Sequence, residues 1–369
     1  MLIEKIELNH IKMDLVSPFR TSLGVEESVE HIIIRIDSVG LTGWGESAVF
    51  STPFYTYETT RTAWHILQNF LIPALIGKNV TGVNQVIHLM KDVRGHNMAK
   101  AGIESAMWDL FAKEKNISLS EMLGGQRDMV EVGVSIGIQN SIPELIERIT
   151  QYLDEGYKRI KIKIAPSNDI KLIEAVRRDF PKIMLQVDAN SAYTIDDLEI
   201  FRNMDKHDLL LIEQPFGEDD FSDHAKLQKE IETPICLDEG IKNFEDVRTS
   251  HEFGSCKIIN IKPGRVGGFS EAVKIHDYCA AKNIPVWHGG MLESGIGRAG
   301  NIALASLPNF TLPGDISASD RYFNLDIVDP PFTLNSDGTI KVPTAPGIGV
   351  DVQIDRLDRL MVQKAEYKS

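Results

Sequence analysis

Five charged residues recur at one spacing, each at or near the end of a short apolar run. They are Lys163, Asp188, Glu213, Asp238 and Lys262, and consecutive members are 25, 25, 25 and 24 residues apart. A charged side chain buried at the end of a strand is costly unless it is paired or ligates a metal. One such residue alone is usually an ordinary capping or salt-bridging group. Five at one period indicate a functional site.

The three acids predict a metal site. If their strands are neighbours in one sheet, Asp188, Glu213 and Asp238 converge at its carboxyl-terminal edge and repel one another. A hard divalent cation removes that repulsion, and oxygen ligands alone suit Mg²⁺, with Mn²⁺ as the alternative. Zinc is disfavoured because no His or Cys joins the three acids at a useful spacing.

The two lysines predict proton transfer. In a ring of eight strands, Lys163 and Lys262 would lie across the mouth and face a bound substrate from opposite sides. This arrangement suits removal of the α-proton of a carboxylate, with the metal stabilising the resulting enediolate. The lysine that takes the proton must be neutral. Lys161, two residues earlier on the same side of the strand, and the metal would both favour the neutral form of Lys163.

Polar residues beside these motifs carry further predictions. Asn190, in VDAN, is either a donor to a neighbouring site residue or a turn residue. Glu239 supports the acid that precedes it or simply accepts a hydrogen bond. Arg265, in KPGRVGG, would favour the neutral form of the second lysine. His288 is either a substrate contact or a core histidine with satisfied hydrogen bonds, and we favour the core histidine.

The elements that must position these residues repeat about every 25 residues. Strand plus helix at this period implies parallel strands with right-handed crossovers. Eight such units fit a closed β/α barrel of the TIM type, and an open doubly wound sheet is the alternative. Eight β-rich runs alternate with helix-like sequence, over 130–138, 159–164, 183–188, 209–214, 234–239, 257–262, 284–289 and 310–316.

The two ends of the chain do not follow this repeat. The first 125 residues read as antiparallel strands followed by three helical segments. The last ~50 residues are irregular and rich in Pro and Gly, and we expect them to fold back across the first part. The sequence thus predicts an α+β capping domain over 1–125, completed by 321–369, and a catalytic barrel over 126–320.

The stretch GIGRAG (295–300) has the G-x-G-x-x-G spacing of a dinucleotide-binding loop. Such a loop follows its strand directly, whereas HGGMLES intervenes here, and only one more strand follows. We therefore expect no nucleotide cofactor. We expect the glycines to allow close packing of the helix that continues through NIALASL, and its N-terminus to be able to attract a substrate carboxylate.

Composition narrows the class of protein. There are 39 basic and 53 acidic residues, a net charge of −14, which argues against nucleic acid or an anionic membrane as a partner. The three cysteines, Cys236, Cys256 and Cys279, show no metal-binding spacing, and no apolar signal segment opens the chain. No apolar run approaches the ~18–20 residues that a membrane helix needs. We expect a cytoplasmic protein.

Several motifs stand in a characteristic order. They are KIK (161–163), VDAN (187–190), IEQP (212–215), LDEG (237–240) and NIKPGRVGG (260–268), with GWGES (43–47), GIESAMWDL (102–110) and PGIGV (346–350). This order resembles the enolase superfamily, muconate-lactonizing subgroup, over nearly the whole chain. The resemblance implies a modified (β/α)7β barrel with an α+β capping domain from both chain ends. It also implies Asp188, Glu213 and Asp238 as Mg²⁺ ligands and Lys163 and Lys262 as the acid/base pair.

Further sequence motifs bear on the identity of the substrate. HGGMLESGIGRAGNIALASLPN followed by LPGDISASDRYF resembles o-succinylbenzoate synthases related to N-acylamino-acid racemases. The resemblance implies a carbon–oxygen lyase of menaquinone biosynthesis that syn-dehydrates 2-succinyl-6-hydroxy-2,4-cyclohexadiene-1-carboxylate, with N-succinylamino-acid racemase activity beside it. The alternatives are N-acylamino-acid racemisation as the main role, then muconate cycloisomerase, then a catalytically silent metal-binding relative. Dipeptide epimerases of this subgroup carry Asp-x-Asp after the eighth strand, whereas Asp315-Ile316-Ser317 stands here, which disfavours an α-ammonium substrate.

The expected partner is a small carboxylate that binds between barrel and cap. Apolar capping loops would exclude water and select the substrate side chain. By resemblance to many relatives we also expect a homo-oligomer. The predicted substrate contacts are Phe19 and Arg20 in SPFRTS, Tyr55, Ser135 at the end of the first barrel strand, Gly290 and Met291.

Overall fold

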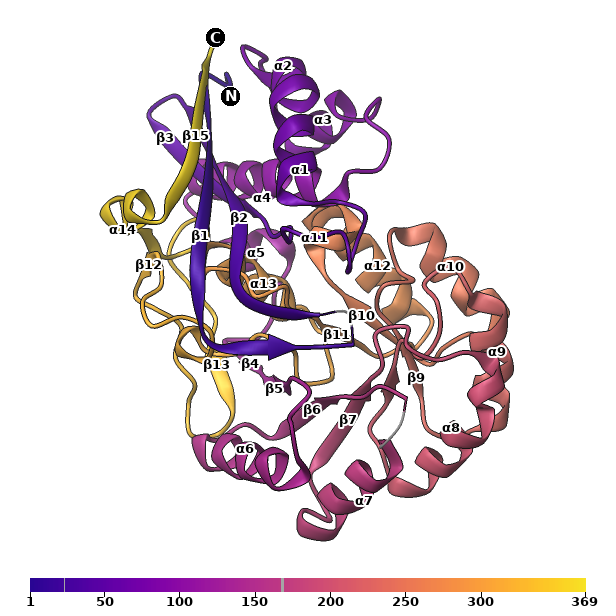
Figure 1. The fold of residues 1–369 in the computed structure, drawn as a ribbon. Helices are drawn as coiled ribbons and strands as arrows, with labels where there is room; N and C mark the ends of the chain where they lie inside the picture. The colour runs from indigo at the N-terminus through magenta and orange to yellow at the C-terminus, as the bar shows by residue number, and fades with distance from the viewer. Residues whose placement is uncertain (23, 167–168) are drawn as a thin grey trace.

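A computed structural model describes residues 1–22, 24–166 and 169–369. Its N-terminal part is built on an antiparallel sheet in the order β15-β1-β2-β3. The first and last strands of the chain lie side by side in it (Figure 1). The four strands are β1 (Lys5–Arg20), β2 (Val25–Ser38), β3 (Leu41–Ser47) and β15 (Met361–Lys368).

The unbroken apolar run of β2 is explained by burial on both faces of this sheet. Ile32 and Ile34 belong to the apolar core that the sheet shares with its own helices, whereas Ile33 belongs to the core that extends into the barrel. A strand covered on both sides needs no alternation of apolar and polar residues. The helical elements here are α1 (Thr60–Ile66), η1 (Leu67–Leu71), α2 (Ile72–Leu75), α3 (Val83–Leu89), α4 (Asn97–Glu114) and α5 (Leu119–Leu123).

Helix α4 lies directly against the backbone of β3, and glycines make this approach feasible. A Cβ atom at Gly43 would stand 2.2 Å from the carbonyl oxygen of Ala106, and one at Gly45 would stand 2.2 Å from that of Gly102. Real side chains never come that close. The motifs GWGES and GIESAMWDL are therefore two halves of one packing contact.

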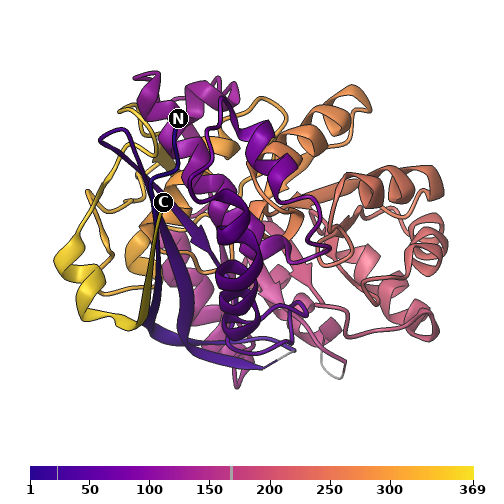
Figure 2. The same cartoon turned by 90° about the horizontal axis from the view of Figure 1, so that it is seen from above.

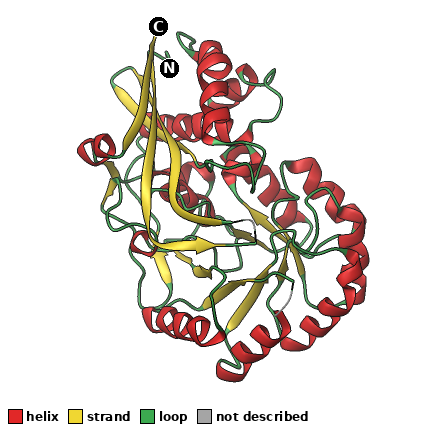
Figure 3. Cartoon of the chain, in the orientation of Figure 1, coloured by secondary structure: helices red, strands yellow, loops and turns green. Residues whose placement is uncertain are grey.

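The second part is a curled parallel sheet in the order β11-β10-β9-β8-β7-β6-β5, with helices on its outside (Figures 1 and 3). Its strands are β5 (Gly133–Ile136), β6 (Arg159–Lys163), β7 (Met184–Asp188), β8 (Ile212–Glu213), β9 (Ile235–Leu237), β10 (Ile258–Ile261) and β11 (Val286–His288). Its α-helices are α6 (Ile142–Glu155), α7 (Asp169–Asp179), α8 (Leu198–Met204), α9 (Phe221–Glu230), α10 (Phe244–Phe253), α11 (Pro263–Val266), α12 (Phe269–Ala281) and α13 (Gly295–Ala305).

The eighth run closes the ring without forming a regular strand. Phe310 makes an isolated parallel bridge to Val286, and Gly314 makes one to Val132. Between them the chain passes from one edge strand to the other, which closes the barrel. The predicted strand over 310–316 is thus reduced to two bridges, and the predicted modified (β/α)7β barrel with a cap is confirmed.

The segment after the barrel runs along its side before it reaches the first sheet (Figure 2). There β12 (Val328–Asp329) pairs with β14 (Asp351–Val352), and β13 (Thr339–Lys341) pairs with β4 (Met129–Glu131). Helix α14 (Ile354–Arg359) then leads into β15. The domain bounds 1–125, 126–320 and 321–369 stay a prediction. Within the described ranges no helix is long and apolar enough to cross a membrane.

GIGRAG forms the start of α13, and its glycines serve packing. A Cβ at Gly295 would lie 2.1 Å from the Val328 side chain, and one at Gly300 would lie 2.5 Å from the ring of Phe269. Both positions leave no room for a side chain, as expected for a helix held close to its neighbours. This helix start is therefore shaped for packing contacts with the surrounding chain.

The N-terminus of α13 is occupied by protein carboxylates. Glu46 of β3 accepts hydrogen bonds from the Ser294 N–H at 3.0 Å, the Ser294 hydroxyl at 2.6 Å and the Gly297 N–H at 2.8 Å. Asp326 accepts from the Gly295 N–H at 2.7 Å. The expectation that these amides attract a substrate carboxylate is wrong, because two side-chain carboxylates already take them. Glu46 thereby attaches the cap to the barrel.

We predict that Glu46→Ala lowers the free energy of unfolding by about 3 kcal/mol, because it leaves buried donors of α13 and His31 without their acceptor. Urea unfolding followed by circular dichroism measures the change. Glu199→Ala is the control, since Glu199 is 77% exposed and its ion pair with Arg202 is worth at most about 1 kcal/mol. Equal destabilisation by the two substitutions would contradict the assigned role of Glu46.

Candidate active site

The register of the barrel sheet sets the predicted residues side by side. Lys163 of β6 pairs with Asp188 of β7, and Asp188 pairs with Glu213 of β8. Glu213 in turn pairs with Cys236, two residues before Asp238. Because parallel strands end at one edge, these side chains share the carboxyl-terminal mouth of the barrel. The geometry that the period of 25 predicts is therefore present.

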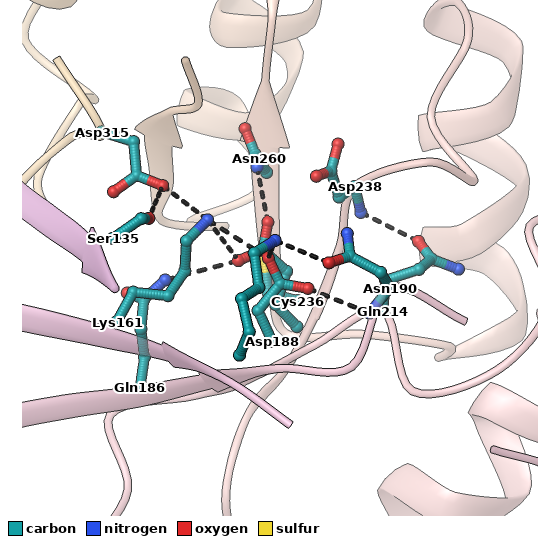
Figure 4. A network of polar contacts seen from close by, with 12 residues as sticks. Ser135, Lys161, Gln186, Asp188, Asn190, Gln214, Cys236, Asp238, Asn260 and Asp315 are labelled. Atoms are coloured by element: carbon teal, nitrogen blue, oxygen red, sulfur yellow. Dashed lines mark hydrogen bonds and ion pairs between the residues drawn. The ribbon is translucent and has the colours of Figure 1, made fainter. Parts of the chain in front are cut away.

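Lys161 lies among three carboxylates, of which Figure 4 labels Asp188 and Asp315. Its Nζ is 2.5 Å from Asp315, 3.1 Å from Glu213 and 3.3 Å from Asp188. Burial disfavours its charge, but the three acids outweigh burial and raise the pKa of Lys161 well above its ordinary value. Lys161 is thus a fixed cation within the barrel.

Asp315 follows the bridge at Gly314 and is held by more than Lys161. The guanidinium of Arg159 lies 2.6 Å from one carboxylate oxygen, and the hydroxyl of Ser135 donates to the other at 2.8 Å. Burial opposes ionisation, but the two cations hold the pKa of Asp315 below its usual range. Arg159 and Lys161 both lie over the Trp287 ring, at 5.3 and 4.9 Å from its centroid.

Lys262 stands on the opposite strand, next to Asp238. Its Nζ donates to Asp238 at 2.8 Å and to the Tyr55 hydroxyl at 2.9 Å, and that hydroxyl donates to Asp238 at 2.8 Å. Arg265 also contacts Asp238 and donates to backbone carbonyls nearby. Burial opposes ionisation of Asp238, but Lys262 and Arg265 lower the pKa of this carboxyl. Arg265 therefore acts on the acid rather than directly on the lysine.

Among the three acids, Glu213 is the one whose ionised form is least favoured by its surroundings. Burial and repulsion by Asp188 raise its pKa well above the ordinary value. The amide of Asn260 donates to it at 2.8 Å. In the part of the chain that the structure describes, no three His, Cys, Asp or Glu side chains surround one point as a metal-ligand set, because the acids turn to the nearby ammonium and guanidinium groups.

Asn190 fulfils both of its predicted roles. It adopts a positive φ of 43°, as a turn residue does, and its side chain bridges two site residues. The Oδ1 accepts from Lys163 at 2.6 Å, and the Nδ2 donates to Glu239 at 2.7 Å. Burial, then repulsion by Asp238, raises the pKa of Glu239 to about 7. Glu239 thus supports the site through Asn190.

A cavity lies between the barrel mouth and the cap. Of the predicted substrate contacts, Phe19, Tyr55, Ser135, Gly290 and Met291 all line it. Lys161, Lys163 and Lys262 form part of its floor. The other lining residues are Thr21, Gly24, Glu26, Phe50, Thr52, Phe54, Asn190, Leu292, Asp315 and Tyr322.

Arg20 differs from its prediction, whereas His288 takes the place that was favoured for it. Arg20 does not line the cavity, because its guanidinium turns away and donates to Asn140 at 3.0 Å on the surface. Its backbone carbonyl accepts a hydrogen bond from the Ile138 N–H. This bond attaches to the barrel the capping arm, which is the end of β1 and the start of β2 where Phe19 and Arg20 pair with Glu26 and Val25. His288 is fully buried, does not line the cavity and has the Gly289 backbone as a polar neighbour, which fits the favoured prediction of a core histidine.

Sequence reasoning missed several residues that shape the site. Arg159 and Asn260 each stand two positions before a predicted lysine, so the period of two places them on the same inward face. This alternation along a strand could have identified both residues from the sequence. The contact of Asp315 with Lys161 joins the last barrel segment to the second strand, and no local pattern indicates it.

Comparisons with known proteins match this architecture. The family model described as "Enolase C-terminal domain-like" matches residues 144–356, and the one described as "Mandelate racemase / muconate lactonizing enzyme, N-terminal domain" matches 5–124. An o-succinylbenzoate synthase from Geobacillus stearothermophilus is 48% identical, covering 97% of this chain and 95% of that protein. An N-succinylamino acid racemase from Amycolatopsis is 46% identical, covering 99% of each.

Solved structures of other proteins share this fold. An enolase superfamily member from Listeria innocua superposes with a TM-score of 0.96 at 46% identity, covering 100% of this chain and 99% of that one. A dipeptide epimerase from Cytophaga hutchinsonii, complexed with Mg and a dipeptide, superposes with a TM-score of 0.92 at 25% identity, covering 99% and 100%. The chain therefore belongs to the enolase superfamily, in the family of mandelate racemase and muconate lactonizing enzyme.

Proposed function

We propose that this protein is an o-succinylbenzoate synthase that dehydrates 2-succinyl-6-hydroxy-2,4-cyclohexadiene-1-carboxylate in menaquinone biosynthesis. The observation that carries the proposal is the pair of lysines, Lys163 and Lys262, that line one cavity from opposite strands. Relatives named for this activity are 48% identical over almost the entire chain, which supports the same chemistry. The cavity accepts a small carboxylate between the two amines.

We also propose Mg²⁺, or Mn²⁺, as the cofactor, held by Asp188, Glu213 and Asp238. The donor set fits a hard cation, because all three side chains offer only oxygen and come from adjacent strands. The raised pKa of Glu213 supports the proposal, since it reflects burial and negative charge that a cation would offset. When bound, such a cation supplies positive charge that stabilises the anion formed on loss of the α-proton.

The protein residues divide the remaining work. Lys163, in its neutral form, takes the α-proton and returns it to the departing hydroxyl on the same face. Asn190 orients its Nζ through the 2.6 Å hydrogen bond. Lys262 remains protonated and faces the anion, with Tyr55 fixing its position. The apolar residues of the cap exclude water from the reacting centre.

N-succinylamino-acid racemisation is the second candidate function, and one observation favours it. The surroundings of Lys163 and Lys262 are alike: each donates to one carboxylate and to one neutral side chain. Two equivalent amines on opposite sides suit two-base exchange of an α-proton. The 46% identity with a racemase from Amycolatopsis supports the same reading.

The proposal is tested by incubating the protein with Mg²⁺ and each substrate. Formation of o-succinylbenzoate is followed by its absorbance, and the α-proton of N-succinyl amino acids is followed by NMR in D₂O. Both activities should disappear with a chelator and return with Mg²⁺ or Mn²⁺. No reaction of either substrate, or full activity in the chelator, would contradict the proposal.

We predict that substitutions of Lys163 and Lys262 have different effects on the two activities. Lys163→Ala should lower both activities at least about 10²-fold, because it removes the general base. Lys262→Ala should abolish racemisation, which needs a base on each face. Lys158→Ala is the control, since Lys158 is exposed and directly precedes β6, the strand that carries Lys163. Unchanged racemisation in Lys262→Ala would show that this lysine is not the second base.

We predict that Asp315→Asn weakens Mg²⁺ binding about fivefold to tenfold in isothermal titration calorimetry. Without Asp315, the Lys161 ammonium would pair more fully with Asp188 and Glu213 and compete with the cation there. In a Lys161→Met background the same substitution should have no further effect on Mg²⁺ affinity, a coupling of about 1 kcal/mol. Equal losses in both backgrounds would show that Asp315 acts independently of Lys161.

A further inference from the structure

Glu26 lies at the end of the capping arm, above the cavity. It pairs directly with Phe19 across β1 and β2, so both side chains point to the same side of the arm. Both residues line the cavity whose floor carries the three lysines. The arm is docked on the barrel through the Arg20 carbonyl and through Ser22, which donates to the Ala189 carbonyl at 3.3 Å. A carboxylate of the cap therefore shares this cavity with the three lysines of the barrel.

This carboxylate has no hydrogen bond or ion pair to any residue that the structure describes. The other acid that lines the cavity, Asp315, is fully engaged by Arg159, Lys161 and Ser135. Glu26 is partly buried, and this burial raises its pKa, with His31 in opposition. A desolvated carboxylate without a partner is unfavourable, so a ligand that brings a cation or a donor to it gains affinity.

Five large apolar side chains also line this cavity. They are Phe19, Phe50, Phe54, Met291 and Leu292. A molecule that matches the cavity thus carries a carboxylate at one end, a hydrocarbon stretch in the middle and a positive charge at the other end. An N-acylated amino acid with a long basic side chain has this order of groups, with the α-proton next to the carboxylate.

We propose that Glu26 is a specificity-determining residue that selects N-acyl amino acids with basic side chains, such as the acylated derivatives of lysine and arginine. The inference rests on the racemase activity given above as the second function. Glu26 does not touch the reacting atoms. It pairs with the terminal ammonium or guanidinium of the side chain while the two lysines flank the α-carbon.

The test compares N-succinyl-L-lysine with N-succinyl-L-norleucine, which differ chiefly in the terminal ammonium. Exchange of the α-proton in D₂O with Mg²⁺ gives kcat/KM for each compound. The wild-type protein should prefer the lysine derivative about tenfold at low ionic strength, and Glu26→Gln should reduce this ratio to near one. Added salt should also reduce the ratio in the wild-type protein.

Glu27→Gln is the matched control. Glu27 is the adjacent residue of β2, is exposed and points to the other side of the arm, so this variant should keep the wild-type ratio. Equal kcat/KM for the two compounds in the wild-type protein, or an unchanged ratio in Glu26→Gln, overturns the inference and leaves the racemase activity intact. Absence of exchange with both compounds overturns the racemase activity and the inference together.

Discussion

The site depends on the mutual neutralisation of buried charges inside a closed barrel. Buried acids and cationic side chains gather there, among them Asp188, Glu213, Asp238, Glu239 and Asp315 with Arg159, Lys161, Lys163, Lys262 and Arg265. Each would be costly alone, so every one must face an opposite charge or a fixed hydrogen bond. The in-register parallel strands satisfy this requirement by placing an acid or a lysine at each successive strand end. The pairing of the buried charges therefore depends on the register of the barrel strands.

The cap contributes through the same type of interaction. Its strand β3 supplies Glu46 to the start of α13, and its helix α4 supplies Glu104, which accepts from the Phe269 and Ser270 N–H groups at the start of α12. Carboxylates of one part thus satisfy exposed helix amides of the other. This attachment sets the position of the capping arm, and the arm in turn places Phe19 above the lysines.

Much of this arrangement was predictable from periodic features of the sequence. Residues that repeat along parallel strands, such as Lys163, Asp188 and Lys262, could be placed because the spacing and the strand register carry the information. Contacts that join distant segments could not be predicted in this way. Arg20 turns outward because Asn140, from a loop 120 residues later, offers an acceptor. The eighth run forms only two bridges, one to the preceding strand at Val286 and one to the distant start of the barrel at Val132.

The three lysines of the cavity differ in their partners, and this difference divides their roles. Lys161 faces three carboxylates, which outweigh burial and raise its pKa. Lys163 and Lys262 each have one carboxylate and one neutral partner, Asn190 and Tyr55 respectively. A group with a single opposite charge loses less electrostatic stabilisation when it gives up its proton. The surroundings thus distinguish Lys161, which has three opposite charges, from two lysines that have one each, although all three share one residue type.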